Sequence, residues 1–169
     1  MEKQSVEAIV GALNMANVRY LVAGGLAVVA HGYVRFTADV DLIVDLEPAN
    51  VMRAVASLER LGYRPRAPVA FAEFADPQQR AQWVREKNLT VFSLYSPQHA
   101  LTEIDLFVEP PLDFETAYRD AVRKEVAPGV AATFIGLQDL RRLKQRAGRP
   151  QDLLDLEKLK SLDSVTRDE

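Results

Sequence analysis

The sequence contains no cysteine among its 169 residues, so disulfide bonds and thiolate metal ligands are excluded. This absence fits a reducing compartment, and we expect a cytoplasmic protein. No apolar run approaches the roughly 20 residues that cross a membrane, and the first ten residues, MEKQSVEAIV, are too charged for a secretory signal. We therefore expect no membrane partner.

Strong positive charge is also missing. The 21 Lys and Arg against 24 Asp and Glu give a net charge of −3, which excludes a strongly basic nucleic-acid-binding body but allows a local basic patch. The dinucleotide-binding pattern G-x-G-x-x-G and the Walker P-loop pattern are absent too. A hydrophobic content of 48% is present; it supports a real core in one domain over 1–169.

Hydrophobic periodicity predicts an α+β protein, with a mixed β-sheet flanked by helices and a C-terminal helical pair over 136–163. Strands are expected at 19–23, 39–46, 89–95, 102–108, 122–126 and 130–135. Helices are expected at 5–18, 26–31, 48–61, 77–87, 114–118, 137–147 and 151–162. Ser5 is the expected N-cap of the first helix. The proline-containing stretch 64–76 is expected to be irregular.

Two carboxylates open the strand expected at 39–46. Strand alternation places Asp39 and Asp41 on one face, opposite Val40 and Leu42. This spacing lets two carboxylates share a divalent cation, because Mg²⁺ prefers hard oxygen ligands. A D-x-D pattern also arises by composition, and acids at strand starts are often ordinary loop residues, so both interpretations stay open.

A third carboxylate, Asp105, lies on a later expected strand with the same alternation. If the two strands are neighbours, Asp39, Asp41 and Asp105 converge on one point, and three such charges repel one another unless cations are present. A pair of Mg²⁺ ions would balance them and support in-line chemistry at phosphorus. The alternative for Asp105 is an exposed acid at the end of the sheet.

Gly24 and Gly25 lie where an expected strand gives way to an expected helix. Backbone N–H groups at the N-terminus of a helix attract phosphate, and glycine lets a phosphate come close. The simpler interpretation is a tight turn between a strand and a helix.

Three segments together resemble a known superfamily. They are GGLAVVAHG at 24–32, the pattern R-x-T-x-D-V-D-L at 35–42 and EIDLFV at 103–108. They resemble the nucleotidyltransferases that include DNA polymerase beta. Within that superfamily the chain is similar to small bacterial enzymes related to abortive-infection toxins, and more distantly to lincosamide-modifying enzymes. Gly25, where many members have Ser, and a longer gap before Asp39 favour the toxin-related branch.

The resemblance implies an activity and the residues that perform it. The enzyme would transfer NMP from an NTP such as ATP to an acceptor hydroxyl and release pyrophosphate. Gly24 and Gly25 would hold the triphosphate. Asp39 and Asp41 would bind both metal ions, Mg²⁺ or Mn²⁺, and Asp105 would bind the catalytic one and help to deprotonate the acceptor. The acceptor would be an RNA 3′ end, a protein side chain or a small molecule, and a toxin-like role implies an antitoxin or another protein partner.

The nucleotide site is expected to include Arg35, Thr37 and Lys144. Arg35 either pairs with one of the acids or neutralises phosphate charge through its planar guanidinium. Lys144, followed by an R-x-x-D-x-x-D pattern at 149–155, resembles the toxin-related branch and would reach a nucleotide phosphate. The two acids of that pattern also suit the first turns of a helix, where negative charge favours the helix dipole.

Other interpretations remain open. His31 either ends a short helix or contacts a phosphate or base, and Trp83 either belongs to the core or stacks on a base. A non-catalytic nucleotide-binding or interaction module on the same fold is the main rival function, but the presence of all three acids disfavours it. A phosphohydrolase using the same carboxylates is disfavoured because it has no need of the glycine turn.

Overall fold

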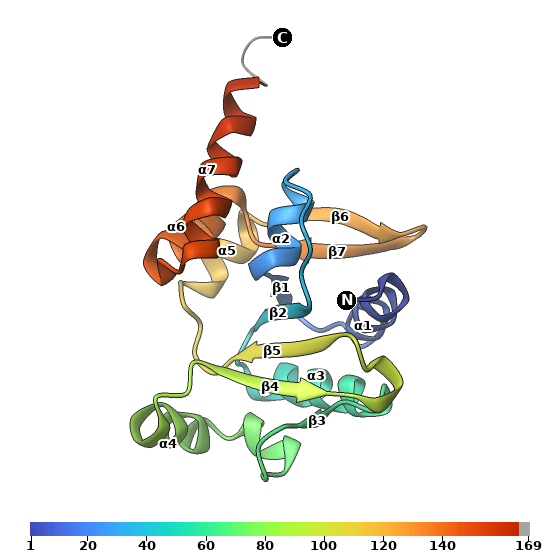
Figure 1. Ribbon diagram of the computed structural model, residues 1–169. Coiled ribbons are helices and arrows are strands. Elements are labelled where there is room, and N and C mark those ends of the chain that lie inside the picture. Colours follow the sequence, from blue (N-terminus) through green and yellow to red (C-terminus); the bar gives the residue numbers. More distant parts are fainter. Residues whose placement is uncertain (166–169) are drawn as a thin grey trace.

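A seven-stranded mixed sheet organises the computed structural model, which describes residues 1–165 (Figure 1). The strands are β1 (Tyr20–Val22), β2 (Asp39–Val44), β3 (Arg64–Pro65), β4 (Val91–Tyr95), β5 (Glu103–Phe107), β6 (Val122–Ala127) and β7 (Val130–Phe134). The helices are α1 (Lys3–Met15), α2 (Gly24–Ala30), α3 (Pro48–Arg60), α4 (Pro77–Lys87), α5 (Phe114–Arg119), α6 (Leu137–Ala147) and α7 (Pro150–Val165), with 3₁₀ turns η1 (Phe71–Ala75) and η2 (Pro97–His99). The predicted α+β class with a mixed sheet and a C-terminal helical pair is confirmed.

The sheet has the order β3-β4-β5-β2-β1-β7-β6. Strands β2 and β5 run parallel at its centre, as do β1 and β7, and the other neighbours are antiparallel. The parallel pairing of β2 with β5 matters most for function, because it brings together two segments that lie far apart in the sequence.

The two faces of β2, β5 and β4 are very different. Apolar side chains such as Val40, Leu106 and Phe92 are buried on one face, where α3 lies behind β4 and β5 (Figure 1). Alternate residues on the other face are only partly buried. Helix α2 packs on β2 and lies on this second side, in front of β1 (Figure 1). A polar, accessible strip therefore runs across three strands beside α2.

Two local expectations were wrong. Helix α1 begins at Lys3 with Glu2 as its N-cap, and Ser5 is buried inside the helix, where its hydroxyl donates to the Glu2 carboxylate. The stretch 64–76 contains both β3 and η1. Pro65 is tolerated in β3 because this strand is the outer edge of the sheet and has one neighbour only. Among residues 1–165, no helix is long and apolar enough to cross a membrane.

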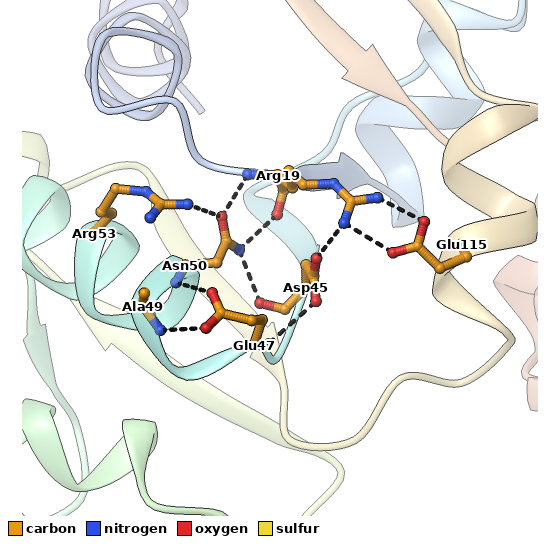
Figure 2. Close-up of polar contacts among 7 residues, drawn as sticks. All are labelled: Arg19, Asp45, Glu47, Ala49, Asn50, Arg53 and Glu115. Carbon is orange, nitrogen blue, oxygen red and sulfur yellow. Dashed lines mark hydrogen bonds and ion pairs between the residues drawn. The ribbon is translucent and has the colours of Figure 1, made fainter.

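A buried asparagine holds together the neighbouring ends of β1 and β2 (Figure 2). The Asn50 side chain is 1% exposed. Its amide nitrogen donates to the carbonyl oxygens of Arg19 (3.1 Å) and Asp45 (2.8 Å), and its oxygen accepts from the Arg19 N–H (2.8 Å) and from Arg53 (3.1 Å). Glu47 caps the helix that carries Asn50 by accepting from the N–H groups of Ala49 and Asn50. One side chain thus joins the start of β1, the end of β2 and the first turn of α3.

We expect Asn50→Ala to lower the free energy of unfolding by about 2–4 kcal/mol, because it leaves buried backbone groups of Arg19 and Asp45 without partners. Urea denaturation measures the change. Arg53→Ala is the matched control, since it removes only one partly buried hydrogen bond to Asn50, and it should cost less than about 1 kcal/mol. Equal effects of the two substitutions would contradict this role of Asn50.

Candidate active site

The glycine turn lies directly against Asp41. Gly24 opens α2 with φ +60°, a conformation that side chains rarely adopt, and a Cβ atom built on it would lie 1.8 Å from Oδ2 of Asp41. The Ala23 N–H also donates to the Asp41 carbonyl oxygen at 2.9 Å. Only glycine fits at position 24, because the carboxylate of Asp41 occupies the space that a side chain needs.

The three predicted carboxylates lie on the accessible strip of the sheet. Asp41 and Asp105 are direct partners across the parallel β2–β5 pair, and Asp39 is the partner of Glu103 one step along. Strands in a sheet lie about 4.8 Å apart and alternate residues share a face, so Asp39, Asp41 and Asp105 share one small area. The neighbouring strands on which the carboxylate proposal depended are therefore present.

Burial, reinforced by mutual repulsion, raises the pKa of two of these acids. Burial first, and then the charges of Asp105 and Asp39, raise the pKa of Asp41 to about 6, although Lys144 and Arg149 oppose the shift. Burial, Asp105 and Glu103 likewise raise the pKa of Asp39 above its ordinary value. Among residues 1–165, none of the three aspartates has a salt-bridge partner, so the site carries negative charge without a protein cation in contact.

The raised pKa of Asp41 predicts a pH-dependent cost to stability. Below its ordinary pKa of 3.8 the carboxyl is neutral in both folded and unfolded chains, and as the pH rises toward about 6 the unfolded chain loses its proton first. The folded state is therefore progressively disfavoured over this interval, by up to about 3 kcal/mol. We expect Asp41→Asn to raise the free energy of unfolding by up to this amount at pH 8 and by little at pH 4, without added metal.

Chemical denaturation at both pH values measures this difference. Asp45→Asn is a control of opposite sign, because Asp45 lies just beyond the same strand but pairs with Arg19 at 2.6 Å. It should lower stability at pH 8. A gain from Asp41→Asn that is equal at pH 4 and pH 8 would contradict the electrostatic explanation.

Side chains that the sequence did not indicate hold the acids on β5. The Ser93 hydroxyl on β4 donates to Oδ1 of Asp105, its register partner. Glu103 forms a salt bridge with Arg66, whose guanidinium also lies 5.4 Å from the centre of the Tyr95 ring. The only available signal for Ser93 was the position of a polar residue between Phe92 and Leu94 on a strand next to β5.

The predicted nucleotide-binding residues Arg35 and Thr37 lie beside Gly25. A Cβ atom built on Gly25 would lie 2.5 Å from Oγ1 of Thr37 and 2.9 Å from a terminal guanidinium nitrogen of Arg35. Arg35 pairs with Asp155 of α7, 2.8 Å away, and not with any of the three site aspartates. The segment between α2 and β2 therefore folds back over the glycine turn.

Lys144, the remaining predicted nucleotide-binding residue, is buried in an ion-pair network. Its ammonium lies 2.9 Å from Oδ1 of Asp152 and 2.8 Å from Oδ2 of Asp155, with 6% of the side chain exposed. Arg149 also pairs with Asp152. Burial opposes the ionisation of Asp155, but hydrogen bonds from Lys144, Gln151 and Arg35 outweigh it and hold its pKa below the ordinary value.

The two open assignments outside this site have structural explanations. Nε2 of His31 lies 2.8 Å from the carbonyl oxygen of Ile135, and burial lowers the pKa of the ring. Trp83 is buried and stacks on Phe92, with ring centres 5.1 Å apart. Each residue is thus engaged in a contact that joins parts of the fold.

The donor set suits a hard divalent cation that also contacts a substrate. Among residues 1–165, no three acidic or histidine side chains form a ready cage for a metal ion. Mg²⁺ seldom uses such a cage, because it retains waters and binds one or two carboxylates together with substrate phosphates. Asp41 and Asp105 are adjacent, and the charge of Asp105 helps to raise the pKa of Asp41. This pair of carboxylates fits that mode of binding.

Comparison with solved structures identifies the class of fold. One matching chain is described as an antigenic nucleotidyltransferase-like protein from Paracoccidioides brasiliensis; the TM-score is 0.59 at 18% sequence identity, and the match covers 95% of this chain and 75% of that chain. The protein therefore has a nucleotidyltransferase-like fold. At the level of sequence, the chain matches no protein-family model, and a comparison with curated proteins gives no match.

Proposed function

We propose that the protein is a metal-dependent nucleotidyltransferase that moves NMP from an NTP to an acceptor hydroxyl. One observation carries the proposal: the glycine turn at the start of α2 is in contact with Asp41, which is the register partner of Asp105. A turn that suits phosphate and a pair of carboxylates that suits cations thus lie side by side.

The chain's own residues have distinct parts in this proposal. Gly24 and Gly25 would present backbone N–H groups to the triphosphate at the start of α2, where Asp41, Thr37 and Arg35 also lie close to the turn. The acceptor oxygen forms a bond to the α-phosphorus, the bond from that phosphorus to the bridging oxygen breaks, and pyrophosphate leaves. Asp105 accepts the proton of the acceptor hydroxyl, and the hydrogen bond from Ser93 orients its carboxylate.

Asp39, Asp41 and Asp105 would hold Mg²⁺ or Mn²⁺. When bound, the cations would offset the charge of the carboxylates and of the phosphate groups. The protein contributes further positive charge from Arg35 and from Lys144 and Arg149, the last two of which act on Asp41 through space.

The toxin-related branch of the superfamily is the most specific assignment that we propose. It rests on Gly25, on the longer gap before Asp39 and on the C-terminal helices, whose Lys144, Asp152 and Asp155 lie in one network with Arg35. In that case the acceptor is an RNA 3′ end, a protein side chain or a small molecule. An antitoxin or another protein would be the partner, and the cytoplasm the location.

Incubation of the protein with each α-labelled NTP, Mg²⁺ and total RNA, cell protein or small hydroxyl compounds tests the proposal. We expect label transfer with at least one acceptor class, lost at least about a hundredfold in Asp41→Asn. Glu86→Gln, an exposed carboxylate substitution on α4, should leave transfer unchanged. Failure of the wild-type protein to bind any NTP by calorimetry in the presence of Mg²⁺ would refute the enzymatic function.

We expect Ser93→Ala to lower kcat for transfer roughly tenfold with little change in the KM for NTP, because it releases the Asp105 carboxylate from its orienting hydrogen bond. Ser93→Thr keeps the hydroxyl and should restore most of the activity. Steady-state kinetics of the three proteins measures the effect. If Ala and Thr variants are equally impaired, packing at β4 and not the hydrogen bond is responsible.

A further inference from the structure

The segment that joins α2 to β2 exposes two large apolar side chains beside the site. Val34 is 81% exposed and Phe36 is 80% exposed. The side chains of the intervening Arg35 and the following Thr37 reach the glycine turn at Gly25. Isolated exposed apolar residues are common, but here they alternate with the residues that cover the glycine turn, and folding gains nothing from exposing them.

Polar contacts hold the backbone of this segment in place. The Arg35 guanidinium pairs with Asp155, donates to its Oδ2 at 2.9 Å, and also donates to the carbonyl oxygen of Phe36 at 2.8 Å. Asp155 itself is fully buried and bonded to Lys144. These contacts hold the backbone next to Phe36 in place. A ligand that stacks on the Phe36 ring would therefore lose little binding free energy to ordering of the chain.

The position of Phe36 relates it to the proposed triphosphate site. Its neighbours Arg35 and Thr37 approach Gly25. Asp39 follows three residues later, so the Cα atoms of Phe36 and Asp39 lie within about 10 Å of each other. A nucleotide with phosphates at the glycine turn and near Asp39 carries its base beyond the α-phosphate. An exposed aromatic ring at that distance is within reach of the base.

We propose that Phe36 is the base-stacking residue of the nucleotide site, a role that rests on the proposed nucleotidyltransferase function. Aromatic stacking accepts every base because each has a π-face, and a larger ring system offers more contact. Stacking on Phe36 therefore admits all four NTPs as donors of NMP. Purine nucleotides bind more tightly than pyrimidine nucleotides.

Calorimetry with two probes separates the base from the phosphates. Mg²⁺-ATP and Mg²⁺-tripolyphosphate are each titrated into wild-type protein, Phe36→Ala and Phe36→Trp. Phe36→Ala should weaken ATP binding roughly tenfold and leave tripolyphosphate binding unchanged. Phe36→Trp should retain or improve ATP affinity. Val34→Ala is the matched control, because it truncates the other exposed apolar side chain of the segment and should bind both probes like wild type.

Two results would overturn the assignment of Phe36 while leaving nucleotide binding intact. One is wild-type ATP affinity in Phe36→Ala, and the other is an equal loss for ATP and tripolyphosphate, which would indicate a displaced segment. By contrast, a wild-type protein that binds neither probe would refute the proposed function itself, and the stacking role with it. Weaker binding of UTP and CTP than of ATP and GTP by wild type, abolished in Phe36→Ala, would support the purine preference.

Discussion

Repulsion between carboxylates that share one area of the sheet is the constraint around which the molecule is arranged. The parallel pairing of β2 with β5 fixes Asp41 against Asp105, and burial together with this repulsion raises the pKa of Asp41 to about 6. A rigid backbone is needed to maintain an arrangement that the free chain would relax. The buried apolar face of both strands and the hydrogen bonds from Asn50 to Arg19 and Asp45 supply that rigidity.

Cations on the C-terminal helices partly offset this negative charge without contacting the three aspartates. Lys144 and Arg149 favour the ionised form of Asp41 without forming a salt bridge to it, because their own bonds go to Asp152 and Asp155. A buried network of this kind contributes little net stability, yet it fixes the relative position of its members. Through Asp155 it also fixes Arg35, so the helical pair and the segment over the glycine turn form one connected unit.

The sequence predicted most of the fold because alternation and turn signals carried the needed information. The alternation of Val40 and Leu42 with Asp39 and Asp41 recurs around Asp105, so both segments could be predicted as strands with one buried face. The contacts of single polar residues could not be predicted from the sequence. Ser93 differs from other strand serines only in its register partner, and the burial of Lys144 depends on how α6 and α7 pack. The site assignments themselves stay predictions.

The exposed position of Val34 also makes the molecule convenient for spectroscopy. The chain has no cysteine, so a thiol introduced at residue 34 would be its sole attachment point for a spin label or a dye. The label would be exposed to solvent, and the adjacent Arg35 holds the backbone in place through its hydrogen bond to Asp155. Its mobility would then report whether the segment over the glycine turn tightens when a ligand arrives, without disturbing the buried network below.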